Sequence, residues 1–590
     1  MPAPRRQPLQ TRWAEDVDPS NPLPEYPRPQ LRRERWQSLN GRWQLAICDG
    51  DGGRPESFPD EIVVPFPVES VLSGIERAVR PSERVWYRRR FEAPARVDGE
   101  RLLLHFGAVD WETIVLVDGR EVGSHRGGHV PFSFDVTDAL ASGGDDHELV
   151  VAVHDPTDAG LQPVGKQSLE PAFIQYTAVT GIWQTVWLEP VPGTRIEGVY
   201  VVTEDDLEGV AVRVQTEGAR PGDRVELVAI ADGREVASGR AGLDPAFVEI
   251  GLRIPGARRW SPDDPFLHDL RVRITRDGQT VDEATSYFGV RTVGTGRDAE
   301  GVWRILLNGE PIFHLGLLDQ GWWPDGLYTA PTDEALAFDV EATKRMGFNT
   351  IRKHVKVEPA RWYWHADRTG VLVWQDMPSP RFDQKAFFEA VTEAGGIPEA
   401  FHLTVADETA AAHREELGAM IDALEPFACI QVWVPFNEAW GQHDTDAVLA
   451  RVAERDPTRV VDGPSGWQDT GSGGLRDHHD YDEEIEFSGA EPDRPVVYGE
   501  IGGLKLAVPG HMAVDRGWGY QQFASADDLE KRYAELMALF ASFVPRGLAA
   551  AIYTQTTDVE SELNGLLTYD RAVFKIEPAK LSALHALFWS

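Results

Sequence analysis

The segment IQVWVPFNEAW, residues 430–440, decides the fold prediction. Its first seven residues, Ile430 to Phe436, form an almost unbroken apolar run with the length of a strand that is buried on both faces. An amide and an acid, Asn437 and Glu438, follow where the run ends. A buried strand that ends on polar groups is typical of a parallel sheet whose functional site lies at the carboxyl ends of the strands.

Seven further apolar runs share this pattern between residue 298 and the C-terminus, and amphipathic helical segments separate most of them. Thr332 caps one predicted helix, which ends near Gly347, and Ser525 opens another that extends to Phe543. Eight β/α units in a segment of this length predict a (β/α)8 barrel over residues 298–590. The eight predicted strands are 312–316, 348–352, 371–374, 430–436, 460–462, 475–478, 496–498 and 548–554.

The chain before residue 298 has a different pattern, with short alternating runs bounded by glycine, proline and aspartate. In residues 1–190, the run 113–117 leads into an Asp-Gly pair, which is typical of a hairpin turn. Residues 191–297 continue the alternation, with Asp-Gly pairs at 232–233 and 277–278. The spacing in this second segment predicts a small antiparallel sandwich ahead of the barrel.

The charge balance excludes several classes of partner. The chain has 95 acidic and 58 basic residues, a formal charge of −37. Such a field repels phosphate backbones and anionic lipid headgroups, so we expect no nucleic acid and no membrane as partners. There is no apolar stretch long enough for a signal peptide or a membrane span, which predicts a cytoplasmic protein.

Cofactor motifs are absent from the sequence. We find no phosphate-binding glycine loop, no dinucleotide fingerprint, no His-Glu-x-x-His and no Gly-x-Ser-x-Gly elbow. The two cysteines lie far apart, which argues against a disulfide framework. His478 and His479, beside Asp477 and Asp480, would suit a metal, but no second ligand cluster accompanies them. No cofactor and no metal are therefore expected.

Two acids stand where predicted barrel strands emerge, Glu438 after the fourth strand and Glu500 after the seventh. Glycoside hydrolysis needs such a pair, because one carboxyl must donate a proton to the leaving oxygen while the other attacks or activates water. Either acid could instead serve only the N-terminus of the following helix. Asn437 favours the catalytic interpretation, since an amide beside the acid can bind a sugar hydroxyl. Trp374 and other indoles near strand ends could stack on a sugar or simply pack in the core.

Together these segments make the chain resemble glycoside hydrolase family 2, which includes β-galactosidases, β-glucuronidases and β-mannosidases. The resemblance covers nearly the whole chain. It implies a multidomain β plus α/β fold: a jelly-roll-like, sugar-binding-like β-sandwich (1–190), an immunoglobulin-like β-sandwich (191–297) and a catalytic TIM barrel (298–590). The segments that carry it are LNGRW (39–43), VPFPVES (64–70), VWYRRRF (85–91), HRGGH (125–129), GIWQTVW (181–187), WSP (260–262), FGVR (288–291), NGEP (308–311), GFNTIRKH (347–354) and FNE (436–438).

The resemblance also implies roles for individual residues in a retaining double displacement. Glu438 would be the general acid/base, and Glu500 the nucleophile that forms a glycosyl ester. Asn437 would hold the 2-hydroxyl, while Arg352 and His354 would support the nucleophile and bind the sugar. The other residues predicted to bind substrate are Asp319, Trp374, Asp376, His479, Asp480, Tyr481 and Gln555.

One departure from the family bears on the sugar. The β-glucuronidases bind the uronic acid carboxylate with an Asn-x-Lys pattern near the last strand, and here Asn564-Gly-Leu566 has leucine in place of the lysine. The sequence therefore predicts an exo-acting, β-galactosidase-like hydrolase that removes a terminal neutral sugar from a small-molecule glycoside or an oligosaccharide. β-Galactofuranosidase, arabinosidase and β-mannosidase activities stay open, as do a non-catalytic carbohydrate-binding protein with this fold and assembly into a homo-oligomer.

Overall fold

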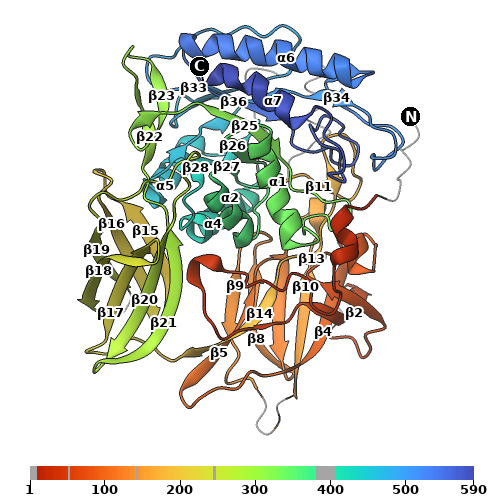
Figure 1. Ribbon diagram of the computed structural model, residues 1–590. Helices are drawn as coiled ribbons and strands as arrows, with labels where there is room; N and C mark the ends of the chain where they lie inside the picture. Colours follow the sequence, from red (N-terminus) through yellow and green to blue (C-terminus); the bar gives the residue numbers. More distant parts are fainter. Residues whose placement is uncertain are drawn as a thin grey trace.

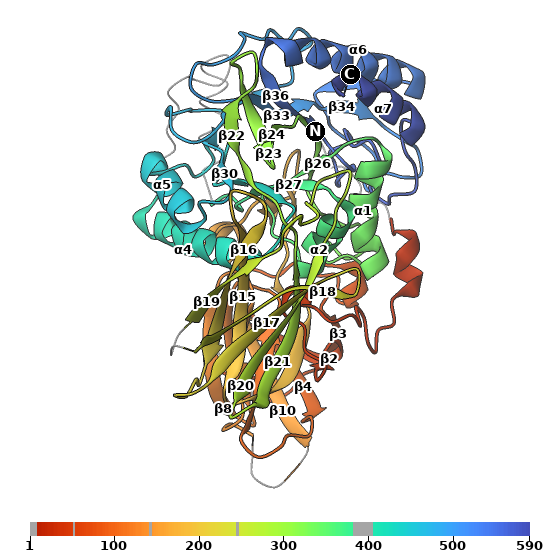
Figure 2. The ribbon, with the colours of Figure 1, turned by 60° about the vertical axis from the view of Figure 1, so that its left-hand side comes forward.

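The computed structural model describes residues 9–50, 53–140, 144, 146–243, 247–380 and 405–589. Two β-rich parts of the chain lie together on one side of an α/β part (Figures 1 and 2). No helix among these described residues combines the length and apolarity needed to cross a bilayer.

The N-terminal part consists of two antiparallel sheets packed face to face. Burial alternates along the strand 112–117, and both sheets contribute apolar side chains to a common core that includes Trp43, Tyr87, Leu104 and Val151. One sheet has the order β3-β2-β4-β10-β7-β8 and the other β1-β14-β5-β9. The strands are β1 (Gln37–Ser38), β2 (Gly41–Asp49), β3 (Asp60–Val64), β4 (Glu83–Glu92), β5 (Glu100–Phe106), β7 (Glu112–Val117), β8 (Arg120–Arg126), β9 (Phe132–Asp135), β10 (Asp146–His154) and β14 (Val186–Pro192).

The middle part is a smaller antiparallel sandwich with a core of its own, formed largely by valine and leucine side chains. A three-stranded sheet, β15-β16-β19, faces a four-stranded sheet, β18-β17-β20-β21. The strands are β15 (Arg195–Thr203), β16 (Gly209–Glu217), β17 (Arg224–Ala231), β18 (Arg234–Gly242), β19 (Phe247–Arg253), β20 (His268–Arg276) and β21 (Gln279–Phe288).

The C-terminal part contains one sheet of eight parallel strands, in the order β30-β28-β27-β26-β25-β36-β33-β32. This is the neighbour order of a barrel cut open between its fifth and sixth strands, and it is consistent with the predicted TIM barrel. Each predicted strand has a counterpart: β25 (His314–Asp319), β26 (Thr350–Lys353), β27 (Leu372–Asp376), β28 (Ile430–Val434), β30 (Val460–Val461), β32 (Arg476–Asp480), β33 (Val496–Gly502) and β36 (Leu548–Thr554).

Helices separate most of these strands, and their caps match the sequence. Thr332 accepts a hydrogen bond from the backbone N–H of Ala335 at 3.1 Å, and Ser525 caps its helix in the same way. The described helices are α1 (Asp333–Arg345), α2 (Ala360–Thr369), α4 (Asp407–Leu424), α5 (Thr445–Arg455), α6 (Ala526–Phe543) and α7 (Pro578–His585).

The structure corrects the prediction of eight complete β/α units. Residues 462–475 and 481–495, which follow the fifth and sixth strands and are all described, contain no helix; the first stretch has only the short strand β31 (Pro464–Ser465) between loops. The glycine and aspartate residues of these stretches favour turns over helix. A short sheet of β22 (Val293–Arg297), β23 (Trp303–Leu307) and β24 (Glu310–Pro311) precedes the barrel, and Ile305 packs among its interior side chains.

The N-terminal sandwich touches the loops at the carboxyl ends of the barrel strands. The backbone N–H groups of Val164 and Gly165 donate to the carbonyl of Ser379 at 2.9 and 3.0 Å. Tyr176 from the sandwich donates its hydroxyl proton to Glu562 from the loop after β36. Side chains of the sandwich can therefore form part of one wall of the barrel mouth.

Candidate active site

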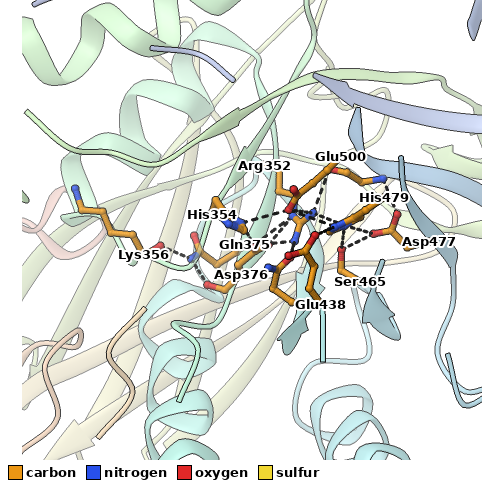
Figure 3. A network of polar contacts seen from close by, with 12 residues as sticks. Arg352, His354, Lys356, Gln375, Asp376, Glu438, Ser465, Asp477, His479 and Glu500 are labelled. Carbon is orange, nitrogen blue, oxygen red and sulfur yellow. Dashed lines mark hydrogen bonds and ion pairs between the residues drawn. The ribbon is translucent and has the colours of Figure 1, made fainter. Parts of the chain in front are cut away.

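Glu438 lies where the backbone turns sharply after the fourth barrel strand (Figure 3). The short strand β29 (Phe436–Asn437) pairs in parallel with β31 (Pro464–Ser465), and the N–H of Glu438 donates to the carbonyl of Ser465 at 2.9 Å. The φ of Glu438 is +50°, in the left-handed region. Because a non-glycine residue is held there at a cost of ~1–3 kcal/mol, the neighbouring contacts must fix this conformation.

Glu500 belongs to β33, and the barrel brings it close to Glu438. Their nearest carboxyl oxygens lie within 4.8 Å of one another, and the residues are only 5% and 7% exposed. Burial and the charge of Glu500 raise the pKa of Glu438. Burial opposes ionisation of Glu500 too, but nearby cations hold the pKa of Glu500 below its ordinary value. The site therefore holds one carboxyl that favours the proton and one that favours the charge.

Arg352 supplies a fixed positive charge to Glu500. Its Nη1 donates to Glu500 Oε1 at 3.3 Å, and its Nε and Nη2 both donate to Asp376 at 3.0 Å. His354 donates from Nδ1 to the same Asp376 at 2.8 Å. Burial lowers the pKa of His354 well below its ordinary value, so this imidazole is neutral. The cations that hold the pKa of Glu500 down are therefore His479, described next, Arg352 and Lys166.

His479 bridges the two carboxyl groups. Its Nδ1 lies 2.8 Å from Glu438 Oε1 and 3.5 Å from Glu500 Oε1. Its Nε2 lies 2.8 Å from Ser465 Oγ, whose hydroxyl proton is donated to Asp477 at 2.5 Å. Burial would lower the pKa of His479, but the negative charges of its carboxyl neighbours outweigh burial and raise it. A protonated Nδ1 that donates to Glu438 Oε1 fits this arrangement.

The same three side chains are a group whose ligand atoms are close enough to hold a metal ion. Arg352 Nη1, however, lies 3.3 Å from Glu500 Oε1 and 3.1 Å from His479 Nε2. This guanidinium already places a positive charge beside the ligand atoms and disfavours a second cation there. The expectation of no metal stays a prediction.

Asn437 and Tyr481 complete the polar surface around Glu500. Asn437 Oδ1 accepts from Arg352 Nη2 at 2.8 Å, while its buried Nδ2 has no hydrogen-bond partner in the described part of the chain. A buried donor without a partner is suited to a ligand. Tyr481 donates its hydroxyl proton to Glu500 Oε2, and its ring stacks on Tyr520 with centroids 3.6 Å apart.

Three residues predicted to contact substrate have protein partners of their own, and their roles in binding stay predictions. Trp374 is fully buried inside the barrel, where its indole N–H donates to His314 Nδ1 at 2.9 Å. Asp319 forms an ion pair with Lys353 Nζ at 2.6 Å. Asp480 is half-buried, and within the described residues its carboxylate accepts only from the N–H of Asp482, at 2.9 Å. Side chains alternate along a strand, so Lys353 and Asp480 point away from the side taken by their neighbours Arg352 and His479.

Gln555 lies near the mouth but not against the carboxyl pair. It is fully buried, and its Nε2 donates to Asn564 Oδ1 at 2.8 Å. Asn564 donates in turn to Glu562 Oε1 at 3.0 Å. The Oε1 of Gln555 has no hydrogen-bond partner within the described ranges, so a role of Gln555 in binding substrate stays a prediction.

Sequence reasoning missed several residues of the site. Ser465 and Asp477 hold His479; the sequence marked Asp477 only as a neighbour of the two histidines, and it marked Ser465 only by its position after a predicted strand. Lys166 and Tyr176 come from the N-terminal sandwich, which is distant in sequence, and no local pattern marks them. Such contacts depend on the packing of the sandwich on the barrel.

Two family models match the chain. The model described as a glycosyl hydrolase 2 galactose-binding domain-like module matches residues 73–181, and the model "Glycosyl hydrolases family 2" matches residues 194–291.

Curated relatives carry two names. A β-glucuronidase from Paenibacillus borealis is 26% identical over 464 residues, which cover 74% of each chain. A β-galactosidase from Thermoanaerobacter pseudethanolicus is 25% identical over 301 residues, which cover 50% of this chain and 39% of that protein. The chain thus spans well under half of the latter relative.

Solved structures share the fold. A β-glucuronidase from Ruminococcus gnavus superposes with a TM-score of 0.75 at 18% identity, covering 96% of this chain and 99% of that one. A β-glucuronidase from Bifidobacterium dentium gives 0.72 at 20% identity, covering 94% and 98%. The family models, the relatives and the carboxyl pair define the class as enzymes that hydrolyse O-glycosyl bonds. The matched models and the named relatives support glycoside hydrolase family 2 for this chain.

Proposed function

We propose that this protein is a retaining, exo-acting β-glycosidase, with Glu438 as general acid/base and Glu500 as nucleophile. One observation carries the proposal: the nearest oxygens of the two buried carboxyl groups lie within 4.8 Å of one another. Retaining glycosidases hold their carboxyl groups about 5–5.5 Å apart, whereas inverting enzymes need about 6.5–9.5 Å to admit a water molecule. The opposite pKa shifts of the pair support the same assignment.

In the first step, Glu500 attacks the anomeric carbon while Glu438 gives its proton to the departing oxygen. The bond to the aglycone breaks, and a glycosyl ester forms on Glu500. In the second step, Glu438 takes a proton from water, whose oxygen attacks the anomeric carbon and releases Glu500 as a carboxylate. Arg352 and Tyr481 hold the two oxygens of Glu500 in place for the attack.

Asn437 is proposed to bind the 2-hydroxyl of the sugar. Its amide is held by Arg352 through Oδ1, which leaves Nδ2 as the donor for the substrate. Hydrogen bonds to this hydroxyl strengthen in the transition state of glycoside hydrolysis.

We propose a β-glucuronide as the first-choice substrate and a β-galactoside as the second. This reverses the order that the sequence predicted. The match to the β-glucuronidase relative extends over 74% of both chains, whereas the β-galactosidase match covers 39% of that protein. Leu566 does sit in the core without exposure, so the cation missing from the Asn-x-Lys pattern is not replaced at that position.

Further assignments are part of the proposal. The domains are proposed to span 1–190, 191–297 and 298–590, with a jelly-roll-like first sandwich. The three-plus-four antiparallel strands of the second support an immunoglobulin-like arrangement. A cytoplasmic location and a homo-oligomer stay predictions.

Variants of the two acids test the mechanism. Glu500→Gln and Glu438→Gln should keep the thermal unfolding midpoint while lowering turnover of an aryl glycoside by about a thousandfold or more, because each removes a chemical step. Glu483→Gln, an exposed acid on the loop after β32, is the control and should keep normal turnover. Near-normal activity of either acid variant would refute the assignment.

Azide rescue and a substrate panel complete the test. With an activated aryl glycoside, azide should restore turnover of Glu438→Ala and give a β-glycosyl azide; an α-azide would contradict retention. A panel of 4-nitrophenyl β-glycosides, including the glucuronide, galactoside, galactofuranoside, arabinoside and mannoside, then identifies the sugar. Lack of turnover on the whole panel would favour a carbohydrate-binding protein.

A further inference from the structure

Lys166 is a buried cation that the N-terminal sandwich contributes to the barrel mouth. The residue is 5% exposed. Its Nζ lies 5.8 Å from the ring centre of Tyr176 and 5.9 Å from that of Trp440, which follows Glu438 by two residues. The lysine therefore stands between the sandwich and the loop that carries the proposed acid/base.

The backbone around Lys166 is fixed on both sides. Gly165 has φ +57°, and a Cβ there would lie 2.6 Å from the carbonyl oxygen of Val355, so only glycine allows this close approach to the barrel. The N–H of Gly165 donates to the carbonyl of Ser379, and the carbonyl of Lys166 accepts from the N–H of Tyr176 at 2.9 Å. These backbone hydrogen bonds fix the position from which the Lys166 side chain extends toward the barrel mouth.

No hydrogen bond or ion pair of the Lys166 ammonium occurs among the residues that the structure describes. Its charge nevertheless lowers the pKa of Glu438, Glu500 and Glu562, none of which bonds to it directly. A buried ammonium without a partner is costly, and an anion from a ligand would compensate it.

Glu562, a nearby acid, does not neutralise this lysine by contact. Its oxygens are engaged by the Tyr176 hydroxyl and by Asn564 Nδ2. Burial raises the pKa of Glu562, which favours the neutral carboxyl. Beside Lys166 there is consequently a hydrogen-bonded carboxyl group and not a paired carboxylate.

We propose that Lys166 determines specificity by binding the carboxylate of a terminal uronic acid. This inference rests on the proposed glycosidase function. The sequence disfavoured a uronide because Leu566 removes the cation expected near the last barrel strand, and the structure places another cation at the mouth from a different domain. The net charge of −37 belongs to the whole chain. The electrostatic potential that acts on a bound sugar depends more on the charges close to it, such as that of Lys166.

A matched pair of substrates isolates the carboxylate. 4-Nitrophenyl β-D-glucuronide and 4-nitrophenyl β-D-glucoside differ only at the sixth carbon. Lys166→Met should lower kcat/KM for the glucuronide by roughly 10- to 100-fold, mainly through KM, as expected for the loss of one hydrogen bond to a charged group. Glucoside hydrolysis should change less than about threefold, and Lys166→Arg should retain part of the preference for the glucuronide.

Lys505→Gln is the matched control, because Lys505 donates to the carbonyl of Gly517 and does not face the carboxyl pair. It should leave both substrates unaffected. If Lys166→Met lowers both substrates equally, or if the wild-type enzyme prefers the glucoside, the proposal is wrong while the glycosidase function stands.

Product binding separates the two proposals. Isothermal titration should show D-glucuronate binding to the wild-type protein more tightly than D-glucose, and Lys166→Met should remove that difference. If this holds while no glycoside is hydrolysed, the lysine binds the carboxylate and the glycosidase function is refuted. If glucuronate and glucose bind alike, the role of Lys166 is refuted.

Discussion

Replacing His479 with glutamine should move the pH profile of hydrolysis to higher pH. Glutamine keeps an amide that can bond to Glu438 but removes the positive charge 2.8 Å from Glu438 Oε1 and 3.5 Å from Glu500 Oε1. Without that charge the pKa of each carboxyl group rises. Activity needs Glu500 ionised and Glu438 protonated. The acid limb of the profile, set by Glu500, and the alkaline limb, set by Glu438, should therefore both move to higher pH.

Coulomb's law gives the size of the shift. Two unit charges 3.5 Å apart interact with ~1.2 kcal/mol at the dielectric constant of water, which corresponds to about 0.9 pKa unit. An effective dielectric constant near 20, typical of protein sites, gives about four times as much. Since the site is buried, we expect both limbs to move upward by about one pH unit or more. The two carboxyl groups titrate as a pair, so each limb reports the pair.

The assay is kcat/KM against pH on the best aryl glycoside of the panel. His478→Gln is the control, because the neighbouring His478 packs on Tyr498 with ring centres 5.3 Å apart and does not contact either acid. An unchanged profile for His479→Gln, a shift to lower pH, or an equal shift in the control would refute the reasoning.

Other contacts give further expectations. Arg352→Met should lower the free energy of unfolding by ~3–5 kcal/mol in urea titration, since it leaves buried carboxylates without their cation; an unchanged stability would contradict the charge network. Tyr481→Phe should lower kcat on aryl glycosides with little change in the unfolding midpoint, because it removes only the hydroxyl bonded to Glu500; unchanged kcat would exclude a role in holding the nucleophile. Trp374→Phe should lower the unfolding midpoint by removing the indole bond to His314, with KM unchanged; a large rise in KM would restore the predicted substrate contact.

Most of the barrel strands could be predicted because they are local apolar runs; β32, with the sequence RDHHD, is not one. All eight have counterparts, including the two-residue strand β30, and the cap at Thr332 was predicted from one side chain. The missing helices after β30 and β32 could not be inferred from strand spacing, because loops of the same length can connect the strands.

The site was predictable where a strand end presents the side chain, as for Glu438 and Glu500. It was not predictable where a shift of one residue along a strand decides to which side a side chain points. Arg352 points to Glu500, whereas its neighbour Lys353 pairs with Asp319. Contacts between domains were beyond local patterns, since they depend on how the sandwich docks on the barrel.

Trapping the covalent intermediate tests the central claim most directly. The protein is incubated with the 2,4-dinitrophenyl 2-deoxy-2-fluoro-β-glycoside of the sugar that the panel identifies, then digested with a protease and analysed by mass spectrometry. The account predicts that activity is lost and that one fluoroglycosyl group is found on the peptide containing Glu500, as an ester of that side chain. Inactivation with the label on another residue, or turnover without any labelled peptide, would contradict it.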